Sequence, residues 1–141
     1  MNRLKNIMIV DDDEVANFIH SDLIESLGIT DSITTLPDGA DAYEYLEKAY
    51  SPTPERGFTI PDLIFLDVNM PILGGFEFME KFNARFGQSR VKPVIYMLST
   101  SFIKSDVERT KKFGQLIKGY LEKPLKNKDL VAILPPMGIT V

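Results

Sequence analysis

Three aspartates stand directly after apolar runs and could act together in metal-ion chemistry. Asp67 follows the run from Leu63 to Leu66, and Asp11 and Asp12 follow the run from Ile7 to Val10. If the two runs are parallel strands of one sheet, their ends meet at one edge and the carboxylates converge there. Close carboxylates repel by roughly 4 kcal/mol per pair at an effective dielectric near 20. The cluster therefore requires a compensating cation, which points to function.

Two further apolar runs also end in polar residues of use to such a site. Ser99 and Thr100 follow the run that ends at Leu98, and Lys123 follows the run that ends at Leu121. Ligands of open parallel sheets bind at the carboxyl ends of the strands. A single polar residue there is commonly explained by contact with water alone, so the argument depends on the whole set.

Short β-branched runs alternate with segments of helical periodicity, which predicts five strands and five helices. The strands are expected at residues 4–10, 32–36, 63–66, 94–98 and 116–121. The first, third and fourth are continuously apolar, which is typical of strands covered on both faces in a parallel α/β sheet. The crossover connections should be right-handed.

The first helix should begin near Asp13 or Glu14 and end at Gly28. Its expected buried stripe consists of Val15, Phe18, Ile19, Leu23 and Leu27. The other helices are expected at about 39–50, 76–86, 105–113 and 127–134, and the fourth is the least apolar. Residues 51–60 contain prolines and a glycine and predict a surface loop, more consistent with a tolerated insertion than with a functional segment.

Length and composition favour one α/β domain over residues 1–141, with a short tail from about 135, where two prolines stop the last helix. The formal net charge of -4 argues against a nucleic-acid surface. There is no cysteine, so disulfide and thiolate chemistry are excluded. No apolar stretch approaches the ~18 residues of a membrane span, and no secretory signal is evident, so we expect a cytoplasmic protein without membrane contact.

Taken together, these motifs resemble the receiver domain of response regulators over essentially the whole chain. The resemblance is carried by Val10-Asp11-Asp12, by Asp67 within residues 62–71, by Ser99 after Met97-Leu98, and by residues 120–124. It implies a doubly wound five-stranded parallel sheet of flavodoxin-like order 2-1-3-4-5, with helices on both faces. It also implies that Asp67 accepts a phosphoryl group from the phosphohistidine of a histidine kinase or a histidine phosphotransfer protein.

The resemblance implies roles for the residues at the strand ends. Asp11, Asp12 and Asp67 would bind Mg²⁺ together with the backbone carbonyl of Asn69, which suits the preference of this ion for hard oxygen ligands. Lys123 would pair with Asp67 before transfer and with a phosphoryl oxygen afterwards. Phosphoryl transfer depends mainly on positioning and charge stabilisation, so a metal and one lysine can be enough.

Ser99 and Tyr120 match the switch residues of the family. The hydroxyl of Ser99 would contact the phosphoryl group, and Tyr120 would turn inward as Ser99 moves, although an edge tyrosine that simply packs is the alternative. The Lys123-Pro124 bond matches a family position with a cis peptide. Asn69 and Ser101, beside the site, would set the rate of slow self-hydrolysis.

Three other residues invite a functional interpretation. Asp13 is expected to cap the first helix or to tune the site. His20 is expected away from the strand ends and has no partner at metal-ligand spacing, so we predict neither a catalytic nor a phosphodonor role. Gly74 departs from the family pattern, which has an acidic or amide residue there, and we expect this to loosen the start of the third helix.

Three functions compete on these residues. The first is a stand-alone phosphorylation switch that acts on an unknown downstream protein through its fourth helix, fifth strand and fifth helix. The second is a receiver fold that binds its partner without phosphorylation, which the intact set of site residues disfavours. The third is a phosphohydrolase, but such enzymes place a second acid two residues after the nucleophile, and this chain has Asn69 there. We therefore expect no enzyme beyond self-phosphorylation and slow autodephosphorylation.

Overall fold

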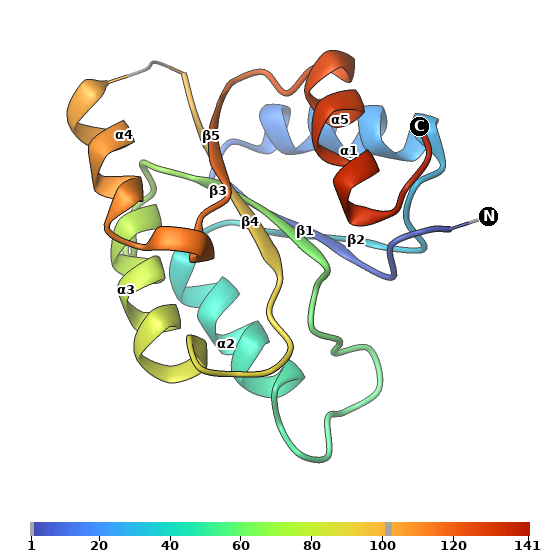
Figure 1. The fold of residues 1–141 in the computed structure, drawn as a ribbon. Coiled ribbons are helices and arrows are strands. Elements are labelled where there is room, and N and C mark those ends of the chain that lie inside the picture. Colours follow the sequence, from blue (N-terminus) through green and yellow to red (C-terminus); the bar gives the residue numbers. More distant parts are fainter. Residues whose placement is uncertain (1, 101–102) are drawn as a thin grey trace.

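A parallel five-stranded sheet lies between two layers of helices (Figure 1). The computed structural model describes residues 2–100 and 103–141. The strands are β1 (Ile7–Val10), β2 (Ile33–Leu36), β3 (Leu63–Asp67), β4 (Val94–Ser99) and β5 (Gly119–Glu122). Their order is β2-β1-β3-β4-β5, and the paired strands are parallel. The predicted fold class and strand order are confirmed.

The helices occupy the segments between the strands. They are α1 (Glu14–Leu27), α2 (Gly39–Ala49), α3 (Gly75–Phe86), α4 (Lys104–Lys111) and α5 (Asn127–Ile133), with 3₁₀ turns at Gly114–Leu116 and Pro135–Met137. The predicted start of the fifth strand at Leu116 is wrong, because this residue ends a 3₁₀ turn and β5 begins only at Gly119. None of the residues of α4 is buried, in agreement with its weakly apolar sequence.

Both faces of the sheet are buried, because successive side chains of a strand point to opposite faces. In β1, Ile7 and Ile9 pack in the core beneath α1 and α5, whereas Met8 and Val10 pack in the core beneath α2 and α3. Figure 1 shows the corresponding layers, with α1 and α5 on one side of the sheet and α2 and α3 on the other. The apolar residues of the strands therefore pack in one of two cores.

The caps of α1 are as predicted, but three of the five residues of its predicted buried stripe are exposed. The carboxylate of Asp13 accepts hydrogen bonds from the first free backbone N–H groups of the helix. Gly28 ends the helix in the left-handed region at φ 61°. Val15, Phe18 and Ile19 are 68%, 73% and 48% exposed. They form an exposed apolar face at the start of the helix.

Polar residues with dedicated hydrogen bonds occupy the buried face of α1 instead. Asn17 donates from Nδ2 to the carbonyl oxygen of Asp11 at 2.8 Å, and His20 accepts at Nε2 from the N–H of Leu125 at 3.0 Å. Ile24, one turn after His20, is fully buried. A pattern of apolar residues alone places the stripe on the wrong side because two of the inward residues are polar.

The loop over residues 51–60 and the segment after α5 both pack on the domain. Phe58 of the loop contacts the ring of Tyr45 on α2 at a centroid distance of 5.1 Å, and the Tyr45 hydroxyl donates to the carbonyl oxygen of Gly57 at 3.4 Å. Ile139 is 4% exposed and belongs to the core beneath α1 and α5. The predicted tail is therefore a packed segment rather than a loose extension. Across the described ranges, 2–100 and 103–141, no helix has the length and hydrophobicity needed to cross a membrane.

Candidate phosphoacceptor and metal site

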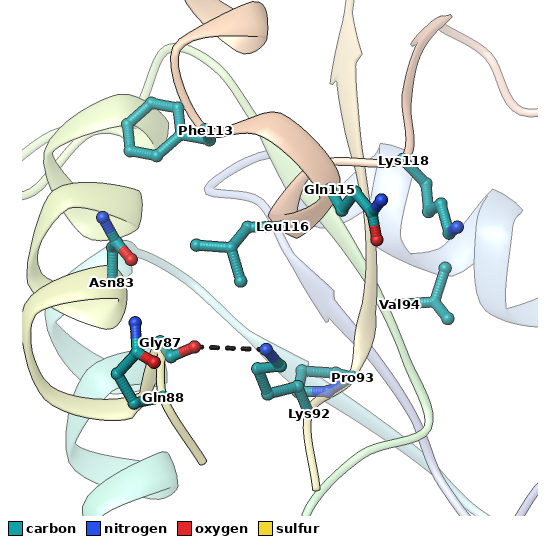
Figure 2. Close-up of a pocket in the computed structure, with 10 residues that line it drawn as sticks. All are labelled: Asn83, Gly87, Gln88, Lys92, Pro93, Val94, Phe113, Gln115, Leu116 and Lys118. Carbon is teal, nitrogen blue, oxygen red and sulfur yellow. Dashed lines mark hydrogen bonds between the residues drawn. The ribbon is translucent and has the colours of Figure 1, made fainter. Parts of the chain in front are cut away.

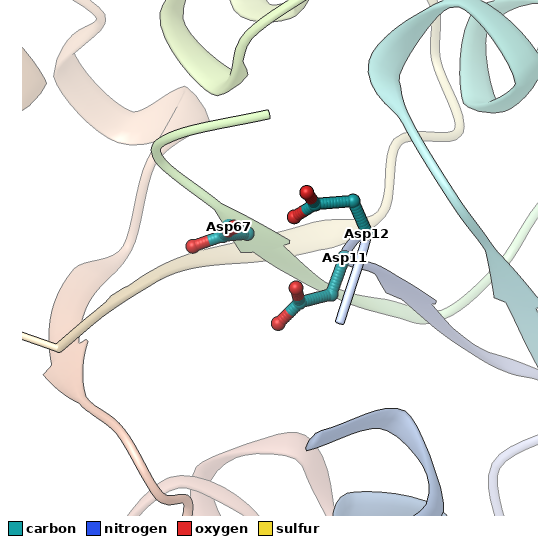
Figure 3. A group of neighbouring side chains, drawn as sticks. All are labelled: Asp11, Asp12 and Asp67. Atoms are coloured by element: carbon teal, nitrogen blue, oxygen red, sulfur yellow. The ribbon is translucent and has the colours of Figure 1, made fainter. Parts of the chain in front are cut away.

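Strand register brings the three aspartates together at the carboxyl edge of the sheet. Val10 pairs with Leu66, so the next residues along, Asp11 and Asp67, lie side by side. Ligand oxygens of Asp11, Asp12 and Asp67 all lie within 4.8 Å of one another (Figure 3). The convergence expected from the sequence is therefore present in the structure.

Lys123 lies between two of these carboxylates. Its Nζ is 2.5 Å from Oδ2 of Asp11 and 3.3 Å from Oδ1 of Asp67. The side chains of Asp11 and Lys123 are only 1% and 11% exposed, so the ammonium is held close to the cluster. The predicted pairing with Asp67 is present, and the contact with Asp11 is the shorter of the two.

The cluster around Asp67 has more negative than positive side chains. Burial and the Asp11 carboxylate raise the pKa of Asp67 to about 6, against the opposing effect of Lys123. Burial lowers the pKa of Lys123, but its contacts with Asp11 and Asp67 outweigh this effect and raise it above the ordinary value. One ammonium cannot balance three carboxylates, and hard oxygen donors of this kind fit Mg²⁺ or a similar divalent ion.

The exposed side of the cluster opens into a cavity of about 340 Å³. Asp12 and Asn69 both line it, so the loop after β3 stands next to the acidic cluster. Glu77 also lines this cavity from the first turn of α3. Glu77 follows a turn rather than a strand, so its sequence position does not predict a place at the site, and only the folded loop brings it near. The use of the Asn69 carbonyl as a ligand stays a prediction.

Ser99 and Tyr120 are neighbours on adjacent strands. Ser99 is the last residue of β4 and is 3% exposed. Burial raises the pKa of Tyr120, while a side-chain hydrogen bond with Ser99 opposes the increase. The two predicted switch residues are thus in contact. Ser101, predicted to influence hydrolysis, lies outside the described residues.

The loop between β5 and α5 carries Lys123 into the site. The Lys123-Pro124 peptide bond is cis, as the family resemblance implied. His20 lies against this loop, since it lines a cavity of about 220 Å³ together with Thr100, Lys123 and Pro124. The expectation that His20 lies away from the strand ends is therefore wrong.

A cavity of about 410 Å³ lies at the opposite end of the sheet, near the start of β4 (Figure 2). Val94 and Lys118 line it, and Nζ of Lys92 donates to the carbonyl oxygen of Gly87 across part of its wall at 3.1 Å. None of its lining residues is acidic. It therefore lacks the carboxylates that line the cavity beside the acidic cluster.

The sequence model of the response regulator receiver domain matches residues 7–135. The chain belongs to this family. Among curated relatives, the Regulator of RpoS of Escherichia coli (strain K12) is 31% identical over 123 residues, covering 87% of this chain and 31% of the relative. The chain thus spans about a third of the length of that relative.

Solved structures of other receivers share the fold. A two-component response regulator from Cytophaga hutchinsonii superposes with a TM-score of 0.83 at 23% identity, covering 96% of this chain and 97% of its own. The receiver domain of the sensor histidine kinase PA1611 from Pseudomonas aeruginosa PAO1 gives a TM-score of 0.69 at 25% identity, covering 94% and 95%. That second structure has a magnesium ion coordinated in its active site cleft. The positions of Asp11, Asp12 and Asp67 in this chain could hold a metal ion.

Proposed function

We propose that this receiver accepts a phosphoryl group on Asp67, in a Mg²⁺-dependent reaction, from the phosphohistidine of a histidine kinase or a histidine phosphotransfer protein. The observation that supports it best is the environment of Asp67, which has two further carboxylates within 4.8 Å and the ammonium of Lys123 at 3.3 Å. We also propose that the protein acts in the cytoplasm.

Each residue of the site has a separate role in the proposed phosphoryl transfer. At neutral pH, a pKa of about 6 leaves Asp67 mostly ionised, so a carboxylate oxygen can attack phosphorus while the bond to the donor imidazole breaks. Asp11, Asp12 and Asp67 would hold Mg²⁺ with the carbonyl of Asn69, and the bound ion would neutralise negative charge on the phosphoryl oxygens. The ammonium of Lys123 would exchange its ion pair with Asp67 for one with a phosphoryl oxygen.

The switch begins at the hydrogen bond between Ser99 and Tyr120. A phosphoryl oxygen that attracts the Ser99 hydroxyl competes with this bond and allows Tyr120 to change position. The neighbouring helix α4 has no buried residue, so little packing energy opposes its movement. The result is a population shift on the face built from α4, β5 and α5, where an unknown downstream protein would bind.

The exposed apolar face of α1 supports a protein phosphodonor. Val15 and Ile19 line the 220 Å³ cavity that also contains Lys123, and Phe18 stands beside them with 73% of its surface exposed. A donor histidine must come within bonding distance of Asp67, so the donor protein has to cover the surface next to the site. An apolar patch at that place favours a helical donor with an apolar face of its own.

The direct test is to add acetyl phosphate, or beryllofluoride as a phosphoryl mimic, with Mg²⁺ and to record intact mass and amide NMR spectra. Asp67→Asn should abolish the added mass. Asp13→Asn should retain it, because the Asp13 carboxylate caps α1 at the N–H groups of Val15 and Ala16 and an asparagine can do the same. An unchanged spectrum around Ser99 and Tyr120 in the modified protein would support the phosphorylation-independent binding module instead.

A further inference from the structure

The loop that carries Lys123 is fixed at its start by two hydrogen bonds that its backbone N–H groups donate. Pro124 has no N–H, so Lys123 and Leu125 supply the first two backbone donors of this loop. The N–H of Lys123 donates to the carbonyl oxygen of Ser99 at 2.7 Å. The N–H of Leu125 donates to Nε2 of His20 at 3.0 Å. One bond therefore attaches the loop to β4 and the other attaches it to α1.

The bond between His20 and Leu125 is shielded from solvent. His20 is 1% exposed and Leu125 is 3% exposed. Because both residues are buried, water cannot take the place of the imidazole unless the loop rearranges. A buried N–H that loses its acceptor is costly, so the bond stabilises this position of the loop. The position of the loop after Pro124 thus depends on a side-chain acceptor on α1.

The same helix also contacts the segment that carries Asp11. Asn17 of α1 donates to the carbonyl oxygen of Asp11 at 2.8 Å, three residues before His20 along the helix. Helix α1 therefore holds both sides of the ion pair in which Nζ of Lys123 lies 2.5 Å from Oδ2 of Asp11. A displacement of the loop from α1 would change the place of the ammonium relative to both Asp11 and Asp67.

The contact requires one form of the imidazole. An Nε2 that accepts a hydrogen bond carries no proton, so the proton of the neutral ring is on Nδ1. Burial lowers the pKa of His20, as does Lys123, whereas the Asp11 and Asp13 carboxylates act in the opposite direction. The neutral ring is the form that suits the buried site.

We propose that His20 is a positioning residue for phosphoryl transfer, which fixes the Lys123 loop against α1 by accepting the N–H of Leu125. The inference rests on the proposed function of Lys123. The competing explanation is that His20 only fills space in the core. If His20 only fills space, any side chain of similar volume can replace it. If His20 positions the loop, its replacement must provide a hydrogen-bond acceptor at the place of Nε2.

Two substitutions separate these explanations. His20→Leu keeps an apolar volume but removes the acceptor, and His20→Gln retains an oxygen that can occupy the place of Nε2. We expect His20→Leu to slow phosphorylation by acetyl phosphate about tenfold, as misplacement of a catalytic group does, without weaker Mg²⁺ binding. His20→Gln should recover most of the wild-type rate. Ile24→Val, in the same helix, is the control for a small loss of packing and should leave the rate unchanged.

NMR gives a readout that packing alone would not produce. His20 is the only histidine of the chain, so its imidazole nitrogens can be assigned directly. We expect Nε2 to be unprotonated and hydrogen-bonded, and the Leu125 amide to exchange slowly in the wild type and in His20→Gln but rapidly in His20→Leu. Equal phosphorylation rates for the Leu and Gln variants, or an Nε2 that carries the proton, would overturn the inference. If the wild type accepts no phosphoryl group at all, the proposed function fails as well.

Discussion

Nζ of Lys123 lies 3.3 Å from Oδ1 of Asp67, close enough for an ion pair yet farther than its contact with Asp11. The ammonium is thus shared between the carboxylate of Asp11, a proposed metal ligand, and that of Asp67, the proposed phosphoacceptor. In the proposed reaction, a small movement of the flexible Lys123 side chain would bring its ammonium from Asp67 to a phosphoryl oxygen. The contact with Asp11 would keep the ammonium in the site during this movement.

The first prediction concerns removal of that ammonium. Lys123→Met should lower the rate of phosphorylation by acetyl phosphate by about 100-fold, because a preorganised charge is lost where negative charge develops. Mg²⁺ binding should persist, since no carboxylate is removed. Intact-mass time courses and a metal titration measure the two effects. Lys128→Met, at an exposed position on α5, should leave both unchanged, and an equal loss in this control would refute the assignment to Lys123.

The second prediction concerns the metal-free protein. The pKa of Asp67 is about 6 in the folded state, above the unfolded value of roughly 3.9. Between these values the folded protein binds more protons than the unfolded chain, so the free energy of unfolding falls as pH rises. Asp67→Asn removes this effect and should stabilise the metal-free protein at pH 7 by on the order of 2 kcal/mol after solvent screening.

The comparison of pH 4 with pH 7 provides the check. Urea unfolding in the presence of EDTA should show little difference between wild type and Asp67→Asn at pH 4 and a clear gain for the variant at pH 7. Asp22→Asn, an exposed change on α1, is the control for loss of one negative charge. A variant that is less stable than the wild type at pH 7 would mean that Lys123 more than compensates the buried carboxylate.

The sequence was sufficient for the architecture and for the acidic cluster. Continuous apolar runs predict buried parallel strands, and a polar residue directly after such a run must lie at the carboxyl edge. Asp11 and Asp67 could therefore be placed side by side before the register was known. Lys123 follows from the same rule, because it stands directly after the last strand.

The sequence was insufficient where polar residues are buried by specific hydrogen bonds. On α1 the inward face contains Asn17 and His20, so a search for apolar periodicity shifts the buried stripe toward Phe18. Hydrogen-bond partners such as Leu125 lie 105 residues away and leave no local signal. Glu77 was missed for a related reason, since its approach to the site depends on the path of the loop after β3.

The third prediction compares two adjacent glycines at the start of α3. A Cβ on Gly75 would lie 2.4 Å from the carbonyl oxygen of Asp67, whereas one on Gly74 would meet the flexible end of Glu77 at 2.7 Å. Gly75→Ser should lower the free energy of unfolding by about 1–3 kcal/mol, because the backbone at Asp67 must move. Gly74→Ser occupies an N-cap position that favours serine and should stay within about 0.5 kcal/mol. Equal losses in urea unfolding would contradict this distinction.

The fourth prediction separates protein donors from small donors. Phe18 is 73% exposed on the apolar face of α1, so its side chain lies mainly in solvent. Phe18→Asp should therefore leave phosphorylation by acetyl phosphate unchanged, while it slows transfer from a phosphorylated histidine phosphotransfer domain by about tenfold or more, because a charge would be buried beneath the donor. The two rates are measured by intact mass with each donor in turn.

The matched control for Phe18→Asp is Val91→Asp. Val91 is also apolar and 61% exposed, but it precedes β4 at the end of the sheet opposite the acidic cluster. Val91→Asp should leave the phosphorylation rate unchanged with both donors, since a protein whose histidine contacts Asp67 would not cover the opposite end of the sheet. If Phe18→Asp slowed both donors equally, the substitution would be acting on the site itself. If it slowed neither, the donor would approach over another surface, and the apolar face of α1 would need a different explanation.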